Sequence, residues 1–226
     1  MKKLDHLKNI FNNYDHFIID LWGVVHNGVK LNEGAMKTIE ELYNNKKNYI
    51  FLSNAPRPVN DVRKFLTEKM KIDKKFLKNI LTSGEAAINS IKNFEYGKLF
   101  FHLGPERDSK IYQGLENYKT KLEKCDYILC TGLYDNQMEK LNFYEKLLKN
   151  SLNKNMICTN PDLIVDRGNM QEYCAGTIAK LFESMGGKVI YFGKPYKEIY
   201  NSILKEKDKA LIIGDNLRTD IKGANE

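Results

Sequence analysis

The chain has 226 residues, of which 42% are hydrophobic, and a formal net charge of +7. This length can bury one sizeable core and a smaller second one. The lysines are spread over many polar stretches instead of forming one basic stripe, which argues against a nucleic-acid partner. No signal peptide or membrane-spanning run is recognisable, so we expect a cytoplasmic protein that has no membrane partner.

Four cysteines are spread through the second half of the chain. Their spacing contains no CxxC pair and no nearby histidine at the spacing of metal ligands. We therefore expect reduced thiols that are packed in the interior, as is usual in the cytoplasm. These residues are Cys125, Cys130, Cys158 and Cys174.

The first third of the chain alternates between helical patterns and apolar runs. Residues 1–12 carry apolar side chains at helical spacing and predict an amphipathic helix. The run FIIDLW, which begins at Phe17, is apolar without helical spacing, as is typical of a strand buried on both faces. Helical patterns at 33–44 and 59–70 flank a second predicted strand at 49–52. This alternation predicts an α/β fold with a doubly wound, Rossmann-like parallel sheet.

The middle of the chain repeats the alternation. A segment of this size can form a compact domain of its own. We therefore expect residues 82–187 to be an inserted α/β domain, while residues 1–81 and 188–226 form the core. Within the insert we predict strands at 98–104, 126–132 and 155–160, and helices around 141–148 and at 175–185, the last closed by the glycine pair 186–187.

The core sheet is expected to resume after the insert, with strands at 188–192 and 210–213. Pro195 suits the first turn of a helix that follows the first of these strands. Residues 217–226 look like the start of another helix, after which a doubly wound sheet usually has one more strand. We therefore expect the last edge strand to be missing at Glu226. An open edge predicts lowered stability or pairing of two copies into a homodimer.

Polar side chains follow the predicted core strands at the points where the strands end. Parallel strands bring these ends to one edge of the sheet, where open α/β folds bind ligands. Taken singly, each residue has a structural explanation, because Asp and Ser are common in turns and caps and a loop lysine is usually solvated. Taken together, they form a candidate site. The residues are Asp20, Ser53, Lys194, Asp215 and Asp220.

These residue types are those that phosphoryl transfer to an aspartate needs. Carboxylate oxygens hold Mg²⁺, and one carboxylate can attack phosphorus. A cation and a hydroxyl can neutralise the phosphoryl oxygens. A dinucleotide-binding function is disfavoured, because no GxGxxG sequence follows the first strand.

The motifs DLWGV, LSN, GKP and GDNLRTD stand in an order that resembles the haloacid dehalogenase (HAD) superfamily of aspartate-nucleophile hydrolases. The large insert between the second and third motifs is similar to class IIA members, which include sugar-phosphate, p-nitrophenyl-phosphate and pyridoxal-phosphate phosphatases. The insert sequences NPDLIVDRGN and AGTIAKLFESMGGKVIYFGKP are similar to the same branch. The resemblance covers nearly the whole chain and implies a Mg²⁺-dependent phosphatase.

The resemblance also implies roles for the acidic residues. Asp20 would be the nucleophile and a Mg²⁺ ligand. Asp215 would be the second carboxylate ligand, and Asp220 would support it or its water shell. The backbone carbonyl of Trp22 would be a further ligand.

The remaining site residues would bind the phosphoryl group. Ser53 and the backbone amide of Asn54 would hold it, and Lys194 would bridge it to Asp20. The insert would be a cap that closes over the site, excludes water and selects the substrate.

One position departs from the family pattern. Phosphatases of this superfamily usually carry a second Asp two residues after the nucleophile, which protonates the leaving oxygen and later activates water. Here that residue is Trp22, whose indole cannot act as an acid or base near neutral pH. Loss of such a group typically costs on the order of 10²–10⁴ in rate. His26 lies a few residues on and is a candidate replacement.

Two functions remain open at this stage. The first is a Mg²⁺-dependent phosphomonoester hydrolase that forms an aspartyl-phosphate on Asp20, acts on a small phosphorylated metabolite such as a sugar phosphate, and has reduced activity or is restricted to activated phosphates. The second is a phosphometabolite-binding or regulatory protein that keeps the pocket without turnover. An Asp20→Asn change separates them, because hydrolysis should stop while binding could survive.

Overall fold

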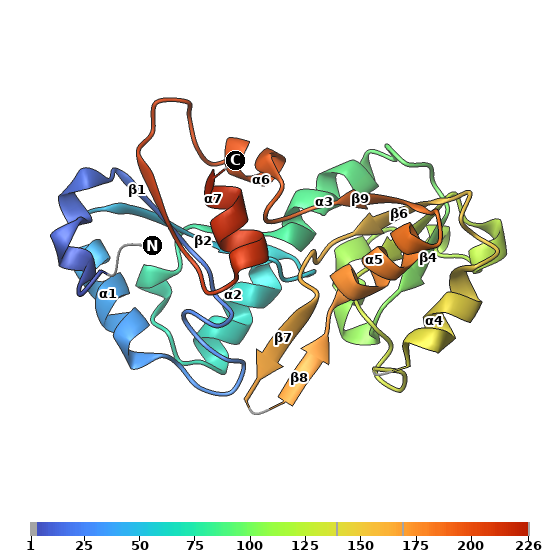
Figure 1. The fold of residues 1–226 in the computed structure, drawn as a ribbon, viewed down its shortest axis with the longest axis horizontal. Coiled ribbons are helices and arrows are strands. Elements are labelled where there is room, and N and C mark those ends of the chain that lie inside the picture. Colours follow the sequence, from blue (N-terminus) through green and yellow to red (C-terminus); the bar gives the residue numbers. More distant parts are fainter. Residues whose placement is uncertain (1–3, 139, 169, 226) are drawn as a thin grey trace.

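The protein is built from two parallel four-stranded sheets, which lie in the two halves of an elongated molecule (Figure 1). The computed structural model describes residues 4–138, 140–168 and 170–225. The first sheet has the order β10-β1-β2-β3 and the second has the order β4-β5-β6-β9. The strands of the first sheet are β1 (His16–Ile19), β2 (Asn48–Ser53), β3 (Ile80–Thr82) and β10 (Ala210–Ile213). Those of the second are β4 (Phe100–Leu103), β5 (Tyr127–Cys130), β6 (Asn155–Cys158) and β9 (Lys188–Tyr191).

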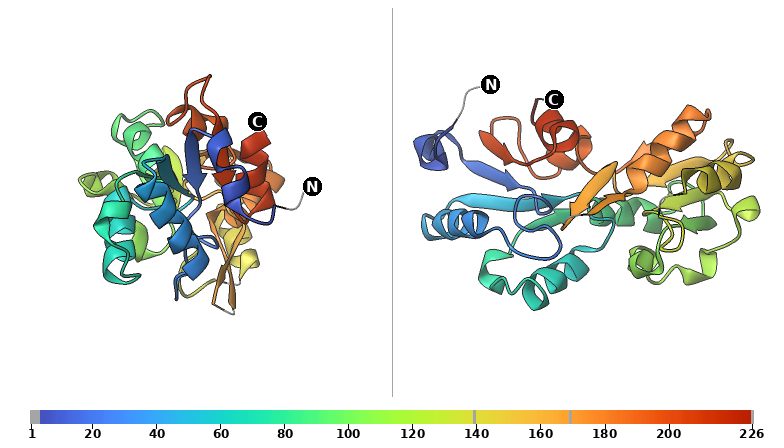
Figure 2. Two further views of the ribbon diagram at one scale, coloured as in Figure 1. Left: turned by 90° about the vertical axis from the view of Figure 1, so that its left-hand side faces the viewer. Right: turned by 60° about the horizontal axis from the view of Figure 1, so that its bottom comes forward.

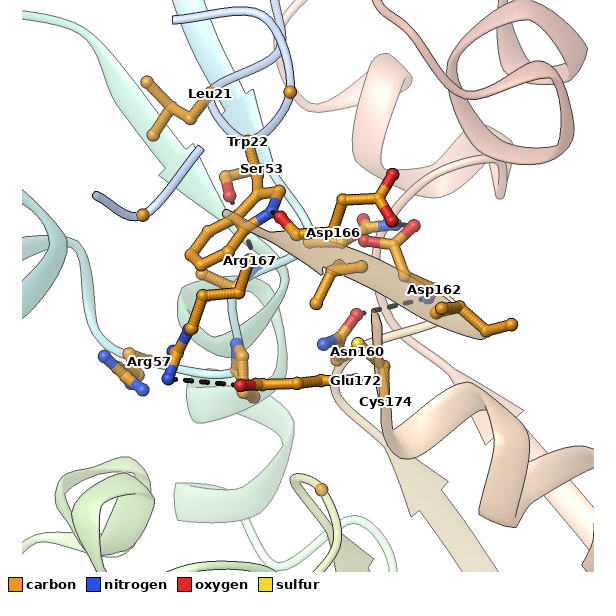
Figure 3. Close-up of a pocket in the computed structure, with 18 of the residues that line it drawn as sticks. Leu21, Trp22, Ser53, Arg57, Asn160, Asp162, Asp166, Arg167, Glu172 and Cys174 are labelled. Atoms are coloured by element: carbon orange, nitrogen blue, oxygen red, sulfur yellow. Dashed lines mark hydrogen bonds and ion pairs between the residues drawn. The ribbon is translucent and has the colours of Figure 1, made fainter. Parts of the chain in front are cut away.

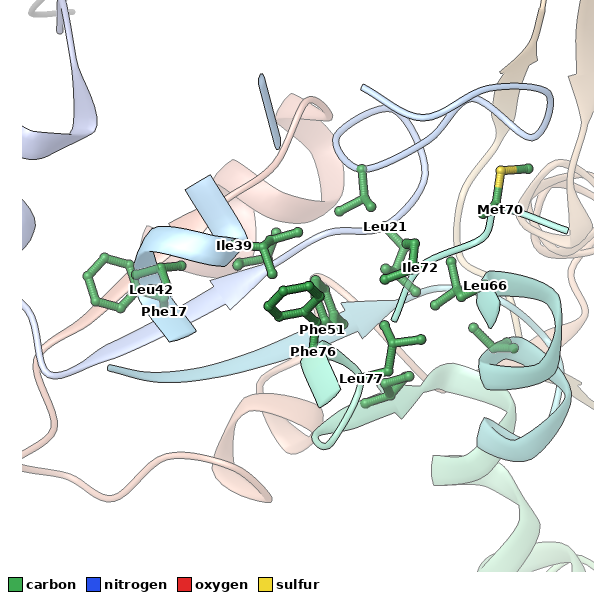
Figure 4. Close-up of a cluster of buried hydrophobic side chains, with 14 residues drawn as sticks. Phe17, Leu21, Ile39, Leu42, Phe51, Leu66, Met70, Ile72, Phe76 and Leu77 are labelled. Atoms are coloured by element: carbon green, nitrogen blue, oxygen red, sulfur yellow. The ribbon is translucent and has the colours of Figure 1, made fainter. Parts of the chain in front are cut away.

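The first sheet is covered on both faces, as the uninterrupted apolar run of β1 predicts. Phe17 and Phe51 face α1 (Glu33–Asn44) and α2 (Val59–Glu68) in one buried cluster, which Figure 4 shows. Ile18 faces the opposite side, where α6 (Lys197–Asn201) packs. The expected α/β architecture is therefore confirmed.

The second sheet is also covered on both faces. One face packs against α4 (Leu141–Leu148) and α5 (Ala175–Ser184), and the other against α3 (Ser83–Lys92). The four cysteines are free and buried, as expected. Gly186 has φ +96° directly after α5, in agreement with the predicted glycine closure of that helix.

The expected place of the strand at 188–192 is wrong. The strand forms as β9, but it pairs in parallel with β6 and completes the second sheet instead of resuming the first. A short apolar run shows that a strand exists, and it carries no information on which edge the strand will join. The connection back to the first sheet therefore follows Tyr191, the last residue of β9.

An antiparallel hairpin, which the sequence reading did not predict, projects from the second half. Its strands are β7 (Ile164–Arg167) and β8 (Met170–Tyr173), and Figures 1 and 2 show it extending beside the first half. Both strands are largely exposed, so they lack the apolar alternation that marks a half-buried strand. The hairpin thus projects from the second half, and the backbone carbonyl of Asp166 in β7 accepts a hydrogen bond from Trp22 of the first half.

The ends of the chain depart in detail from the expected pattern. The predicted N-terminal helix is replaced by two short 3₁₀ turns, Leu7–Asn9 and Phe11–Asn13, within the described part of residues 1–12. Pro195 precedes α6 instead of lying in its first turn, because Tyr196 is the N-cap. The helix expected from residue 217 does form, as a π-helical turn, Leu217–Ile221, that continues into α7 (Lys222–Asn225); Glu226 lies outside the described residues. Among those residues no helix is long and apolar enough to cross a membrane.

We predict a pH-dependent stability that arises from His102 in β4. This buried side chain bonds to Thr131 Oγ1 at 2.9 Å, and burial, with a smaller effect of Lys119, lowers its pKa to about 4. In the unfolded chain the pKa of a histidine is about 6.5. Between that pH and about 4, His102 therefore binds a proton in the unfolded state but not in the folded state. The free energy of unfolding should therefore fall between pH 6.5 and 4, by up to about 3 kcal/mol from this residue.

Urea unfolding at a series of pH values measures this effect. His102→Gln should reduce the slope of the pH dependence in that window, to which the buried His26 also contributes, and His6→Gln at an exposed position serves as the control. Equal slopes for His102→Gln and the unmodified protein would contradict the prediction.

Candidate active site

A cavity of about 900 Å³ opens between the two halves at the carboxyl ends of the first sheet's strands. Asp20 follows β1, Ser53 ends β2, and Asp215 follows β10, and all three line this cavity. Residues of the second half line it as well, among them Asp162 and Asp166 (Figure 3). The fold thus brings the sequence-predicted residues to one edge, where open parallel sheets present their ligand sites.

Lys194 lies between two buried carboxylates. Its Nζ atom donates to Oδ1 of Asp20 and to Oδ1 of Asp220, at 2.6 Å in each case. Asp20, Lys194 and Asp220 are 7%, 2% and 1% exposed. A buried charge needs a partner of opposite sign, and here one ammonium serves two carboxylates.

The charges around Lys194 shift the pKa values in opposite directions. Burial raises the pKa of Asp20 to about 7; the Lys194 ammonium opposes this shift, and the Asp220 carboxylate adds to it. Burial by itself would lower the pKa of Lys194, but the carboxylates of Asp20, Asp220 and Asp162 outweigh it, so the pKa lies above its usual value. Lys194 is therefore a permanent cation that keeps part of the Asp20 population ionised at neutral pH.

Three carboxylates at this edge form a set that fits a divalent metal ion. Asp20, Asp215 and Asp220 each offer an oxygen, and these oxygens lie within 4.8 Å of one another. Oxygen donors of this kind are what Mg²⁺ prefers. Asp215 is the exposed member of the three and opens to the cavity. Partial burial of its carboxyl raises its pKa, and the nearby Asp220 carboxylate raises it further. With Lys194 the only cation bonded to the cluster among the described residues, excess negative charge remains for a metal to balance.

Two glycines allow the carboxylates to approach the backbone this closely. Gly23 has φ +88°, and a Cβ there would lie 2.0 Å from Oδ2 of Asp215. A Cβ on Gly214 would lie 2.1 Å from Cγ of Asp220. The left-handed backbone at Gly23 therefore provides the space that the Asp215 carboxylate occupies.

Asn54 connects three distant segments of the chain. Its side-chain oxygen accepts from the backbone N–H of Lys194 at 2.8 Å. Its amide nitrogen donates to the carbonyl of Lys194 and to Oδ1 of Asp162, each at 3.1 Å. The Asn54 side chain thus positions Lys194, a role that sequence reasoning missed because it assigned only the backbone amide.

The structure adds Asp162 to the site. This residue follows the second half's β6, and burial raises the pKa of its carboxyl, while Lys194 opposes the shift. The only signal for it in the sequence was the NPDLIVDRGN stretch, whose contact with the opposite half could not be derived from local pattern. Ser53, in contrast, lies where expected, buried and facing the cavity, with its Oγ accepting from the amide of Ala55 at 3.3 Å.

Trp22 and His26 line the cavity without acid–base partners. The ring of His26 packs edge-on against the rings of Trp22 and Phe65, with a distance of 5.4 Å between ring centroids in each case. Its Nδ1 accepts a hydrogen bond from the backbone amide of Gly28 at 3.1 Å. Burial lowers the pKa of His26 to about 4. At neutral pH the imidazole is therefore neutral, a poor proton donor and a weak base, which disfavours it as the replacement for the absent Asp.

Comparison with known families identifies the chain. Residues 17–117 match a family described as haloacid dehalogenase-like hydrolase, and residues 191–226 match one described as HAD-hydrolase-like. A hydrolase of the haloacid dehalogenase-like family from Brucella suis is 31% identical, with 99% of this chain and 86% of that chain covered and a TM-score of 0.91. The chain therefore belongs to the haloacid dehalogenase-like hydrolase family, as the motif order predicts. Among curated protein sequences, none matches it.

Other solved structures share the fold at lower identity. A possible sugar phosphatase from Cytophaga hutchinsonii is 20% identical, with 99% of this chain and 85% of that chain covered and a TM-score of 0.75. A p-nitrophenyl phosphatase from Archaeoglobus fulgidus is 21% identical, with 94% and 82% covered and a TM-score of 0.71. At these identities the likeness extends to the fold alone.

We predict that Lys194→Met lowers the free energy of unfolding at pH 7 by about 3–5 kcal/mol, because it leaves Asp20 and Asp220 buried without a counter-charge. The loss should shrink as the pH falls, since burial raises the pKa of Asp20 and protonation of this carboxyl removes its uncompensated charge. Denaturant titrations at pH 7 and pH 5 measure both effects.

The exposed cavity residue Lys69 provides a matched control, and Lys69→Met should change the stability by less than about 1 kcal/mol. The double variant Lys194→Met/Asp220→Asn should recover part of the loss. A Lys194→Met protein as stable as the original at pH 7 would contradict the stabilising role of Lys194 between Asp20 and Asp220.

Proposed function

We propose that this protein is a Mg²⁺-dependent phosphomonoester hydrolase that acts through an aspartyl-phosphate on Asp20, with a small phosphorylated metabolite such as a sugar phosphate as substrate. The observation that carries the proposal is the Asp20–Lys194–Asp220 arrangement beside Asp215, at the opening of a cavity large enough for a small molecule. Membership of a hydrolase family supports it.

In this proposal Asp20 attacks phosphorus. Lys194 holds one oxygen of Asp20 at 2.6 Å, which leaves the other oxygen for the attack. The same ammonium, with the hydroxyl of Ser53 and the backbone amide of Asn54, would neutralise and hold the phosphoryl oxygens. The rigid placement of Lys194 by Asn54 means that little reorganisation is needed during the reaction.

Asp20 and Asp215 would hold Mg²⁺, together with the backbone carbonyl of Trp22. When bound, the ion would neutralise charge on the phosphoryl group and on the carboxylates as the bond to Asp20 forms. Asp220 would act on Lys194 more than on the ion, because one of its oxygens bonds to the ammonium at 2.6 Å. This assignment differs from the support of Asp215 that the family resemblance implies.

The second half of the molecule would act as the cap. We propose that residues 82–191 form it and that residues 1–81 with 192–226 form the core, a division that follows the pairing of β9. Asp162 and the β7–β8 hairpin line the cavity from the cap side. Substrate choice would then rest on residues of the cap, which exclude water from the site when they are in place.

We predict that incubation with Mg²⁺ and acetyl phosphate gives release of phosphate or a single phosphoryl adduct, and that Asp20→Asn abolishes both. The reason is that an amide oxygen is a far weaker nucleophile than a carboxylate. Intact-protein mass and a phosphate-release assay make the measurement. Asp15→Asn is the control, an exposed residue at the opposite end of the same strand, and should behave as the unmodified protein.

Removal of divalent ions gives a second test. Excess chelator should reduce phosphate release by at least about 10²-fold, and added Mg²⁺ should restore it, because the carboxylate cluster repels the phosphoryl group when no metal balances it. Binding of phosphate esters without adduct or release, retained in Asp20→Asn, would instead favour the phosphometabolite-binding protein. Trp22 is the feature that keeps this second function open.

A further inference from the structure

Trp22, two residues after Asp20, is directed to the β7–β8 hairpin. Its indole Nε1 donates to the backbone carbonyl of Asp166 at 2.8 Å. The guanidinium of Arg167 lies 5.6 Å from the centre of the ring, and Figure 3 shows these residues together at the cavity wall. Arg167 in turn pairs with Glu172 across the hairpin at 3.5 Å. The Trp22 side chain therefore joins the core loop to the cap.

The ring is fixed in this position from its other sides. A Cβ on Gly28 would lie 2.5 Å from Cη2 of Trp22, so the backbone of Gly28 packs directly on the indole. His26 contacts the ring edge-on, with the centroids 5.4 Å apart. A side chain held by a hydrogen bond, a cation and close packing cannot turn aside for another group.

The consequence concerns the leaving oxygen of the substrate. In an in-line displacement this oxygen lies on the side of phosphorus opposite to Asp20, toward the cavity and its cap wall. An indole N–H is a donor only and does not release its proton near neutral pH. The N–H of Trp22 is in addition occupied by the carbonyl of Asp166, and the carboxylate of Glu172 is paired with Arg167. The indole of Trp22 therefore supplies no proton at this wall of the cavity.

We propose that the substrates are phosphate compounds whose leaving oxygen departs as a stable anion, above all acyl phosphates, because Trp22 holds the hairpin in place at the position from which a proton would have to come. This inference rests on the proposed function and adds the chemical class of the substrate. Trp22 is a positioning residue in this scheme, since it acts through Asp166 and Arg167 of the hairpin.

The reaction balances without a proton donor. A carboxylate oxygen of Asp20 forms a bond to phosphorus while the bond between phosphorus and the leaving oxygen breaks, and the leaving group keeps the electron pair as a carboxylate or phenolate. Water then attacks phosphorus, the bond to Asp20 breaks, and its carboxylate is regenerated. One proton of the water stays on the released phosphate and the other passes to solvent.

The test is the dependence of kcat/KM on the leaving group in the unmodified protein. Acetyl phosphate, p-nitrophenyl phosphate, phenyl phosphate and glycerol phosphate form a series of increasingly poor leaving groups. We expect kcat/KM to fall by about 10²–10⁴-fold from the first to the last, which is the contribution that a general acid would otherwise make. Similar values across the series would overturn the inference and leave the proposed function intact, whereas no turnover and no adduct with any compound would overturn both.

Variants at Trp22 test the assignment. Trp22→Asp places a carboxyl group at that position. It should therefore raise the value of kcat/KM for glycerol phosphate, relative to the value for p-nitrophenyl phosphate, by at least about 10-fold. Trp22→Phe keeps a ring but removes the N–H, so it should leave this ratio unchanged while KM rises, as expected if the bond to Asp166 holds the hairpin. An altered ratio in Trp22→Phe would contradict the positioning role, and if Trp22→Asp fails to fold, the series with the unmodified protein still decides.

Asp162→Asn addresses the rival proton donor. Asp162 lies near Lys194 and bonds to Asn54, so its loss could lower the absolute rates. Under the proposal the ratio between alkyl and aryl phosphates stays the same. A selective loss with glycerol phosphate would identify Asp162 as a general acid and overturn the inference.

Discussion

The structure of this site depends on one buried ammonium among carboxylates. Lys194 bonds to Asp20 and Asp220 at 2.6 Å and supplies the positive charge that compensates these two buried carboxylates. To place this cation, the chain must leave the second sheet after β9 and return to the first sheet's edge, where Asn54 holds the backbone of Lys194 on both sides. The positions of Asp20, Asp220 and Asn54 around Lys194 all follow from that placement.

The two halves of the molecule are joined at the site by polar contacts between side chains and backbone. Asn54 reaches Asp162, and Trp22 reaches Asp166. Through these contacts, residues at the edge of the first sheet also hold the wall of the cavity. Position 22 shows the resulting compromise, because an indole that holds the hairpin cannot also move protons. Under the proposed function, this arrangement fixes a wall of the cavity and leaves no general acid at position 22.

Much of the architecture could be predicted from local sequence, since most strands and helices were placed within a few residues by apolar periodicity and glycine signals. β9 was found as a strand but assigned to the wrong sheet, because hydrogen bonding to β6 depends on which edge is free. The β7–β8 hairpin was missed because its exposed strands carry no apolar alternation. The roles of Asp162 and of the Asn54 side chain were missed because both arise from contacts across more than a hundred residues.

The sequence by itself determined the α/β class, the order of the motifs and the residue types at the strand ends, because these follow from periodicity and from the side of a parallel sheet at which strands end. It also determined that position 22 carries no acid or base. Only the tertiary structure decided that Asp220 pairs with Lys194 and that the indole of Trp22 bonds to the β7–β8 hairpin. Such pairings depend on distances between segments far apart in the chain. These distances and the burial of the groups then set the strength of each charge–charge interaction and the pKa of each group.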